Sequence, residues 1–262
     1  MNRGKLPASS SLLLWSCYNS VADAVQIRMG RLKTKDKTSA IMPLPLQIFI
    51  GLEIAAVIVA AFLYVPPARG FADKESARII IFHVPCAMIA TLAYAISTIY
   101  AIAYLIRGNT ASDMKSAASA SLGFLFTALA TVTGMIFAKM EWGMAWNWDP
   151  REVSILMLMI VYAAYFALRG SILNSAARAK ISSVYNIMAG LLMPFFIFVL
   201  PRLVPGLHPS NTLTSRSGLS PEYRIALGGA MLGYMMLYIW ILRLSVRISE
   251  HAMLRRRKSI ER

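Results

Sequence analysis

Apolar residues along this chain of 262 residues form six blocks, which short polar segments separate. The blocks cover approximately residues 43–64, 77–106, 117–137, 153–168, 181–200 and 223–242. A helix needs roughly 20 mostly apolar residues to cross the hydrocarbon core of a bilayer, and most of the blocks have about this length or more. The pattern therefore predicts an all-α fold, a polytopic integral membrane bundle of six transmembrane helices, with no internal repeat.

Basic segments flank the predicted membrane domain, which covers residues 43–245. We expect residues 1–42 to form a basic cytoplasmic arm and residues 246–262 a basic cytoplasmic tail. Roughly two thirds of the Lys and Arg residues lie in these two segments and in the loops after the second and fourth blocks. The positive-inside rule then places both termini in the cytoplasm and the other three loops at the outer face.

Composition supports the membrane class and excludes several others. The chain is 57% hydrophobic and 15% charged, and its net charge of +15 follows the loop pattern, so membrane lipid is an expected partner and nucleic acid is not. The two cysteines, Cys17 and Cys86, allow no disulfide framework and no Cys-x-x-Cys site. The chain has no nucleotide-binding loop and no recognisable nucleophile with an adjacent base, so we expect no turnover by this chain alone.

One acidic residue, Glu53, lies near the middle of the first block. A charged residue at that depth costs about 2.5–3.5 kcal/mol on insertion scales, so its side chain should face the bundle, be protonated or find a polar partner. Two interpretations stay open. Glu53 is either tolerated by the packing or is the ion site of a small-solute or ion transporter subunit.

A tryptophan-rich segment follows the third block and contains Trp142, Trp146 and Trp148. Such a segment is typical of an interfacial belt, because indole rings prefer the headgroup level of a bilayer. The tight spacing beside Asp149 and Arg151 also favours an aromatic surface with an acid and a base at its edge. A flat apolar ligand with charged edges would fit such a surface.

Two histidines lie on the same predicted face as the tryptophans. His83 is in the first two turns of the second block, and His208 is in the loop after the fifth. A single histidine in an apolar helix usually packs, and a histidine in a polar loop is usually solvated. Their convergence with the tryptophan-rich segment indicates a shared site. Cys86, about one turn from His83, is more typical of a small packing residue than of a metal ligand.

Two neutral imidazoles that approach from opposite faces can supply both axial ligands of a haem iron. Haem propionates need cationic partners, for which Arg151 is the first candidate and Lys139 and Arg202 are weaker ones. Asp149 could orient Arg151 or a backbone donor. A zinc site is the competing use of the histidine pair, but it would need further ligands close by.

These motifs resemble those of a known family. The tryptophan-rich segment is similar to the signature of the haem-handling proteins of cytochrome c biogenesis, and the histidine motifs resemble those of its haem exporter protein C branch. The resemblance covers roughly residues 43–245 and rests on Trp142-Gly143, Trp146, Trp148-Asp149-Pro150-Arg151, His83-Val84-Pro85 and Leu207-His208.

The resemblance implies that His83 and His208 are axial ligands of a non-covalently bound haem b. It also implies that the loop from Trp142 to Arg151, with Gly143, holds haem at the outer face of a bacterial inner membrane. A periplasmic haem chaperone would receive the haem, with help from ATP-binding-cassette transporter subunits. Glu152 instead resembles the larger cytochrome c synthetase branch, so a subunit of a haem ligation complex is the alternative.

Overall fold

The computed structural model of the protein describes residues 42–68, 71–208 and 219–260. Six helical segments in this part are long and apolar enough to cross a membrane, and the described residues contain no strand. The predicted all-α, six-span fold is therefore confirmed. The expected basic arm lies, apart from Met42, outside the described residues.

The described residues form nine elements. They are α2 (Leu44–Leu63), the 3-10 turn η1 (Ser76–Ile79), α3 (Ile80–Arg107), α4 (Thr110–Trp142), α5 (Pro150–Ser171), α6 (Ser175–Pro194), the π-helical turn η2 (Phe195–Val199), α7 (Leu200–Leu203) and α8 (Pro221–Ile260).

Helices α4, α5 and α8 and the helical run from α6 to α7 extend beyond their predicted blocks at both ends. The fifth block was expected to end near residue 200, but the helical segment continues through Pro201 to Leu203, directly after the π-helical turn η2. The sixth block continues as α8 to Ile260, so the expected tail begins as helix. A helix of this length, at 1.5 Å per residue, exceeds the thickness of a hydrocarbon core.

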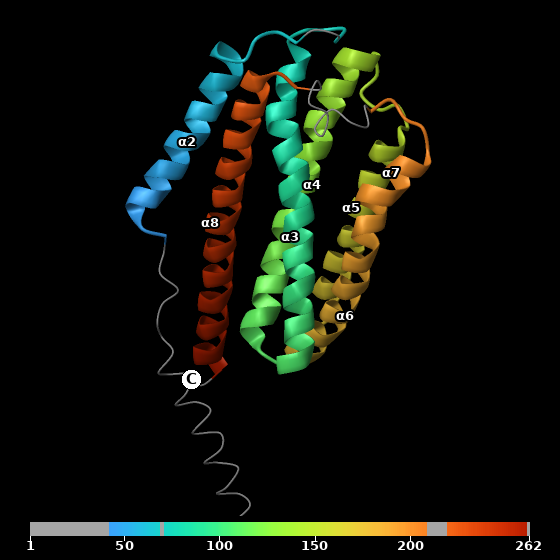
Figure 1. The fold of residues 1–262 in the computed structure, drawn as a ribbon. Helices are drawn as coiled ribbons and strands as arrows, with labels where there is room; N and C mark the ends of the chain where they lie inside the picture. Colours follow the sequence, from blue (N-terminus) through green and yellow to red (C-terminus); the bar gives the residue numbers. More distant parts are fainter. Residues whose placement is uncertain (1–41, 69–70, 209–218, 261–262) are drawn as a thin grey trace, which may run out of the picture. The chain divides into compact units, whose positions relative to one another are not determined.

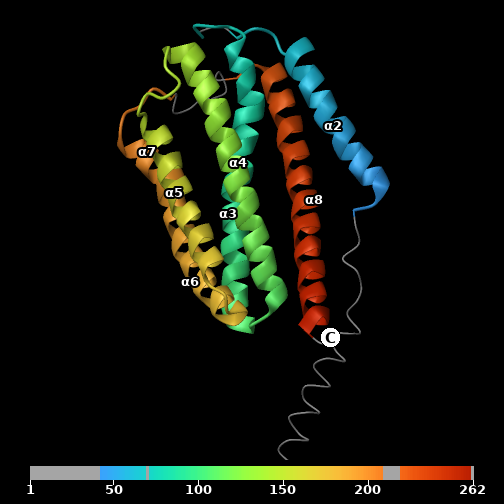
Figure 2. The ribbon, with the colours of Figure 1, turned by 180° about the vertical axis from the view of Figure 1, so that it is seen from behind.

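Figures 1 and 2 show the order of the helices side by side: α2 at one edge, then α8, then α3 with α4, and α5 with α6 at the other edge. The segment 143–149, the segment 204–208 and η1 all lie at one end of the bundle (Figure 1), which we call the tryptophan-loop end. The α3–α4 and α5–α6 turns lie at the opposite end (Figure 1). The two histidine-bearing segments are therefore brought to the same end.

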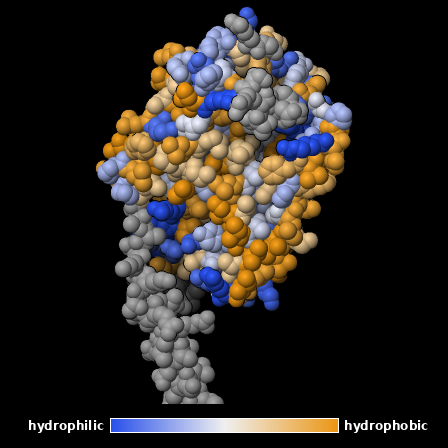
Figure 3. Space-filling model, in the orientation of Figure 1, coloured by the Kyte–Doolittle hydropathy of each residue, from blue (hydrophilic) through white to orange (hydrophobic). Residues whose placement is uncertain are grey.

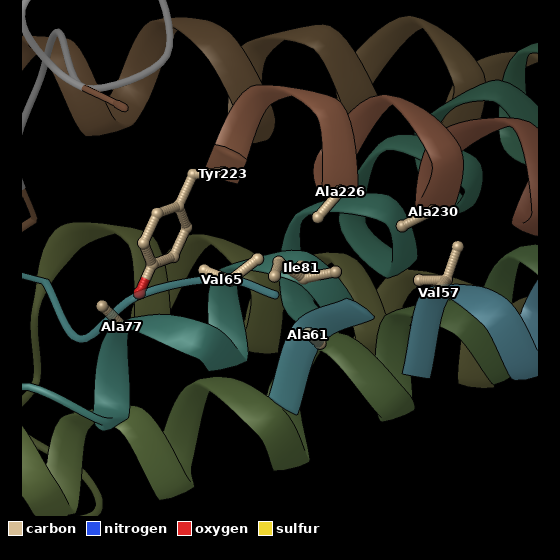
Figure 4. Close-up of a cluster of buried hydrophobic side chains, with 8 residues drawn as sticks. All are labelled: Val57, Ala61, Val65, Ala77, Ile81, Tyr223, Ala226 and Ala230. Atoms are coloured by element: carbon tan, nitrogen blue, oxygen red, sulfur yellow. The ribbon is translucent and has the colours of Figure 1, made fainter. Parts of the chain in front are cut away.

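Small side chains let α2 approach α8 closely, as helices in lipid require. Figure 4 shows one of the buried clusters, in which Val57 and Ala61 of α2 meet Ala226 and Ala230 of α8 beside Ile81 of α3. The outward face carries large apolar side chains. Figure 3 shows that apolar side chains cover much of the visible surface and that strongly hydrophilic ones gather toward its two ends, as expected of a membrane-spanning bundle.

Glu53 of α2 lies against α8 in the same contact. A side chain at Gly233 would collide with the Glu53 carboxyl group, and one at Gly229 would lie 3.7 Å from Oε1. The buried Oε2 finds no hydrogen-bond partner among the described residues. The glycines of α8 therefore provide the room that the carboxyl group occupies.

Polar contacts join four helices toward the opposite end. Asn186 Nδ2 of α6 donates to Ser97 Oγ of α3 at 2.7 Å and to Ser116 Oγ of α4 at 2.9 Å. Arg169 of α5 makes a two-pronged ion pair with Asp113 of α4, with both N···O distances 2.8 Å. Such paired groups fix helix positions in an apolar medium. At the tryptophan-loop end, the same helices form walls of a groove.

Candidate functional site

A groove at the tryptophan-loop end holds about 840 Å³ of space free of protein atoms, counting the part open to the surroundings. Its wall is mostly apolar and combines residues from α3, α4, α5, η2 and α7 with the segment 143–149 and the segment that follows α7. The expected site residues that line it are His83, Trp146, Arg151 and His208. Residues far apart in the sequence therefore line one groove. The two histidines among them were predicted from the topology to lie on the same face of the membrane.

The His83 ring is oriented by α4. Its Nδ1 lies 3.0 Å from the carbonyl oxygen of Ala130 and 3.1 Å from Thr133 Oγ1. Because a carbonyl oxygen only accepts, the neutral ring carries its proton on Nδ1 and leaves the Nε2 lone pair available. Gly134 makes room for the ring, since a Cβ there would lie 3.1 Å from His83 Cε1.

Asp149 orients His208. The His208 Nδ1 lies 2.9 Å from Asp149 Oδ1, and the backbone N–H of Leu207 donates to Asp149 Oδ2 at 2.6 Å. Gly206 permits this approach, because a Cβ at that position would lie only 2.5 Å from Asp149 Oδ2. With Nδ1 donating to the carboxylate, His208 also keeps its Nε2 lone pair for a ligand.

The pKa shifts of Asp149 and His208 favour a carboxylate beside a neutral imidazole. Burial raises the pKa of Asp149, but backbone N–H groups of Arg151 and Leu207 and the His208 ring together hold the pKa below its ordinary value. Burial lowers the pKa of His208, and this effect outweighs the opposing influence of Asp149. At neutral pH the pair is therefore a carboxylate that accepts from a neutral ring.

The three tryptophans have different surroundings. Trp142 contacts the His208 ring edge-on, with the centroids 4.9 Å apart, and Trp146 lines the groove. Trp148 is 72% exposed and contacts Trp146 edge-on at 6.0 Å. Gly143 ends α4 at a φ of +82°, a left-handed conformation suited to glycine, so it shapes the loop and does not line the groove.

Glu152 fixes the conformation of the loop before α5. Asp149 is the N-cap of this helix and accepts from the backbone N–H of Arg151 at 2.9 Å. Glu152 Oε2 accepts from the backbone N–H groups of Asn147 at 2.7 Å and Asp149 at 3.2 Å. These bonds flank Trp148, whose φ of +56° is rare for a bulky residue, and hold it in that conformation.

The remaining candidates lie outside the groove lining. Lys139 and Arg202 do not line it, and the Arg202 side chain donates to the carbonyl oxygen of Phe198 at 2.5 Å. Cys86 is buried among apolar residues of α3, α4 and α8, which fits a packing role. In the part of the chain that the structure describes, no three His, Cys, Asp or Glu side chains gather so that they could hold a metal ion by themselves.

Sequence reasoning missed several residues that shape the site. The carbonyl group of Ala130, the close approach at Gly206 and the π-helical turn that contributes Phe196 and Ile197 depend on tertiary contacts. Glu152 had a readable signal. An acidic N-cap, a proline at the first helical position and a glutamate at the third form a capping-box pattern, here Asp149-Pro150-Arg151-Glu152.

Fold and site together define a multi-pass membrane protein with two oriented histidines in one mostly apolar groove at one end of the bundle. The chain belongs to the Heme exporter protein C family, whose model matches residues 31–262. This confirms the resemblance indicated by the motifs.

Curated relatives agree with this assignment. Heme exporter protein C of Paracoccus denitrificans is 28% identical over 179 residues, 68% of this chain and 74% of the relative. Heme exporter protein C of Rhodobacter capsulatus is 28% identical over 206 residues, 78% of this chain and 84% of the relative. A putative cytochrome c biosynthesis ccmC-like mitochondrial protein of Marchantia polymorpha is 34% identical over 118 residues, 44% of this chain and 51% of the relative.

Proposed function

We propose that this protein binds haem b non-covalently in the groove and delivers it to a periplasmic haem chaperone during cytochrome c maturation. One observation carries the proposal. Both His83 and His208 use Nδ1 for a hydrogen bond to the protein, so both present Nε2 as the atom available to an iron in the same groove. The names of the relatives, which refer to heme export and cytochrome c biosynthesis, support the same function.

The groove residues fit the chemistry of haem. Two neutral imidazoles suit the axial positions of its iron, and bound haem would supply that iron as the metal centre of the cargo. Trp146 and the apolar wall suit the macrocycle, and Arg151 is the cationic group in the lining that could pair with a propionate. The protein's own contribution is to bind and orient, so we propose haem handling and no catalytic turnover.

Orientation and partners follow from the same proposal. The tryptophan-loop end would lie at the periplasmic face of the bacterial inner membrane, with both termini in the cytoplasm. ATP-binding-cassette transporter subunits would assist the delivery. The family assignment and the six apolar helices support these assignments.

A haem titration of the purified protein in detergent tests the proposal. We expect saturable binding and, in the oxidised and reduced forms, the absorption spectrum of low-spin iron with two nitrogen ligands. Failure of the wild-type protein to bind haem would contradict the proposed function.

Replacing Glu53 with Gln separates haem handling from transport. The Glu53 side chain lies between α2 and α8 and does not line the groove, so we expect the variant to bind haem with wild-type affinity and spectrum. The measurement is the same titration, beside uptake assays in vesicles. If the wild-type protein takes up a solute but does not bind haem, and Glu53→Gln abolishes the uptake, the result supports the transporter interpretation.

Haem binding should weaken in acid. A proton on His208 would occupy the Nε2 lone pair, and because burial holds the pKa of His208 below its ordinary value of 6.5, binding should persist at pH 6.5 and fall at lower pH. The unfolded chain takes up this proton first, so the free energy of unfolding should also decrease as the pH falls below 6.5. Absorbance titrations check this, and loss of binding that begins well above pH 6.5 would contradict it.

A further inference from the structure

Glu141, in the last turn of α4, is bound by the segment 71–76, which precedes η1 and includes its first residue. Its carboxylate accepts from the backbone N–H groups of Ala72 at 3.1 Å and Asp73 at 3.3 Å, and the Ser76 hydroxyl lies 2.7 Å from Oε1. An acid at the C-terminal end of a helix is unfavourable, because the helix dipole is negative there. The two backbone donors, with the Ser76 hydroxyl shared between Oε1 and the Asp73 carbonyl oxygen at 2.7 Å each, offset this cost, so the contact fixes the segment 71–76 to the end of α4.

Aromatic contacts lead from the same segment to His208. Phe71 contacts Phe137 edge-on, with ring centroids 6.2 Å apart, and Phe137 contacts Trp142 in the same way at 5.6 Å. Trp142 follows Glu141 in the chain and contacts the His208 ring at 4.9 Å. The bound carboxylate and this aromatic row therefore act on the same turn of α4.

The Asp149 bond alone does not determine the orientation of the His208 ring. A hydrogen bond at Nδ1 fixes one atom of the imidazole, and the ring can still turn about that bond. The edge contact with Trp142 restricts this motion, and it does so only if the end of α4 is itself held in place. Glu141 provides that restraint from the side of the segment 71–76.

We propose that Glu141 is a positioning residue for His208: by binding Ala72, Asp73 and Ser76 it holds Trp142 against the imidazole and so directs Nε2 into the groove. This inference rests on the proposed function of His208 as a haem ligand. The segment 71–76 does not line the groove, but through Glu141 it helps to orient the His208 ring.

The test compares Glu141→Ala with Glu75→Ala in the full-length protein. Glu75 is the matched control, because it lies in the same connection and its exposed carboxylate pairs with Arg78 and not with α4. We expect Glu141→Ala to bind haem about tenfold more weakly, as expected for loss of an outer-shell partner. Part of its bound haem should become high-spin, and added imidazole should restore the low-spin spectrum. Glu75→Ala should match the wild type.

A double variant shows whether Glu141 acts through His208. If it does, Glu141→Ala should change neither affinity nor spectrum in a His208→Ala background, whereas a general loss of stability would weaken both backgrounds equally. Ser76→Ala removes the shared hydroxyl and keeps both backbone donors, so it should shift the spectrum in the same direction by a smaller amount. This variant replaces Glu141→Ala in the test if Glu141→Ala does not fold.

The possible outcomes separate the two proposals. A wild-type spectrum and affinity in Glu141→Ala, or in Ser76→Ala if Glu141→Ala does not fold, overturns the positioning role and leaves the haem proposal intact. An equal effect of Glu141→Ala with and without His208 also overturns it. Failure of the wild-type protein to bind haem overturns both proposals.

Discussion

We expect His83→Ala and His208→Ala each to lose the low-spin spectrum of haem held between two imidazoles. Each substitution removes one proposed axial ligand, whose ring the protein already orients through Nδ1. The loss of affinity should exceed the roughly 10–100-fold that removal of an outer-shell partner costs. Absorption spectra of the oxidised and reduced proteins, with haem content per protein, measure the effect.

The third histidine of the chain provides the control. His251 lies on α8, where its Nε2 is 3.5 Å from Arg247 Nε, and it does not line the groove. We expect His251→Ala to bind haem as the wild type does. Full retention of the low-spin spectrum in either His83→Ala or His208→Ala would contradict the axial assignment of that residue.

Asp149→Asn should have the second largest effect. In the wild type, one carboxylate oxygen accepts from Leu207 N and the other from the His208 ring and Arg151 N. An amide offers only one oxygen, and its NH₂ group must then face an N–H donor. Whichever way the amide turns, its NH₂ group meets an N–H group of Leu207 or of the His208 ring, which displaces His208 from its place. We therefore expect haem affinity to fall about 10–100-fold.

Two further variants make this prediction specific. Gly206→Ala should act in the same direction, because the added Cβ would press on the Asp149 carboxylate. Glu75→Gln, which changes an exposed acid on another connection, should leave haem affinity unchanged. Wild-type affinity in Asp149→Asn would show that His208 does not need this carboxylate. The measurement is a haem titration of each purified variant.

The sequence predicted the fold well because membrane spans are determined by composition over about twenty residues. It also predicted that His83 and His208 share one face, since odd and even loops of such a bundle lie on opposite sides of the membrane. Both predictions depend on the order of apolar blocks and not on side-chain detail. The groove that both histidines line agrees with this topology.

The roles of individual tryptophans could not be predicted in the same way. Their directions depend on the left-handed turn at Gly143 and on the bonds from Glu152 to the backbone on either side of Trp148. In the loop that these two features shape, Trp148 is exposed and Trp146 lines the groove. Such conformations are fixed by hydrogen bonds that hydropathy and spacing do not report.

The contact between α2 and α8 has a consequence for biosynthesis. Glu53 is in the first apolar helix of the described chain, and the glycines that accommodate it are in the last. Until the ribosome has delivered α8, the carboxyl group of Glu53 has no such place, and exposing a charge to lipid costs about 2.5–3.5 kcal/mol on insertion scales. Formation of this contact therefore has to await α8, and a chain truncated before α8 would leave the carboxyl group of Glu53 without its place between the two helices.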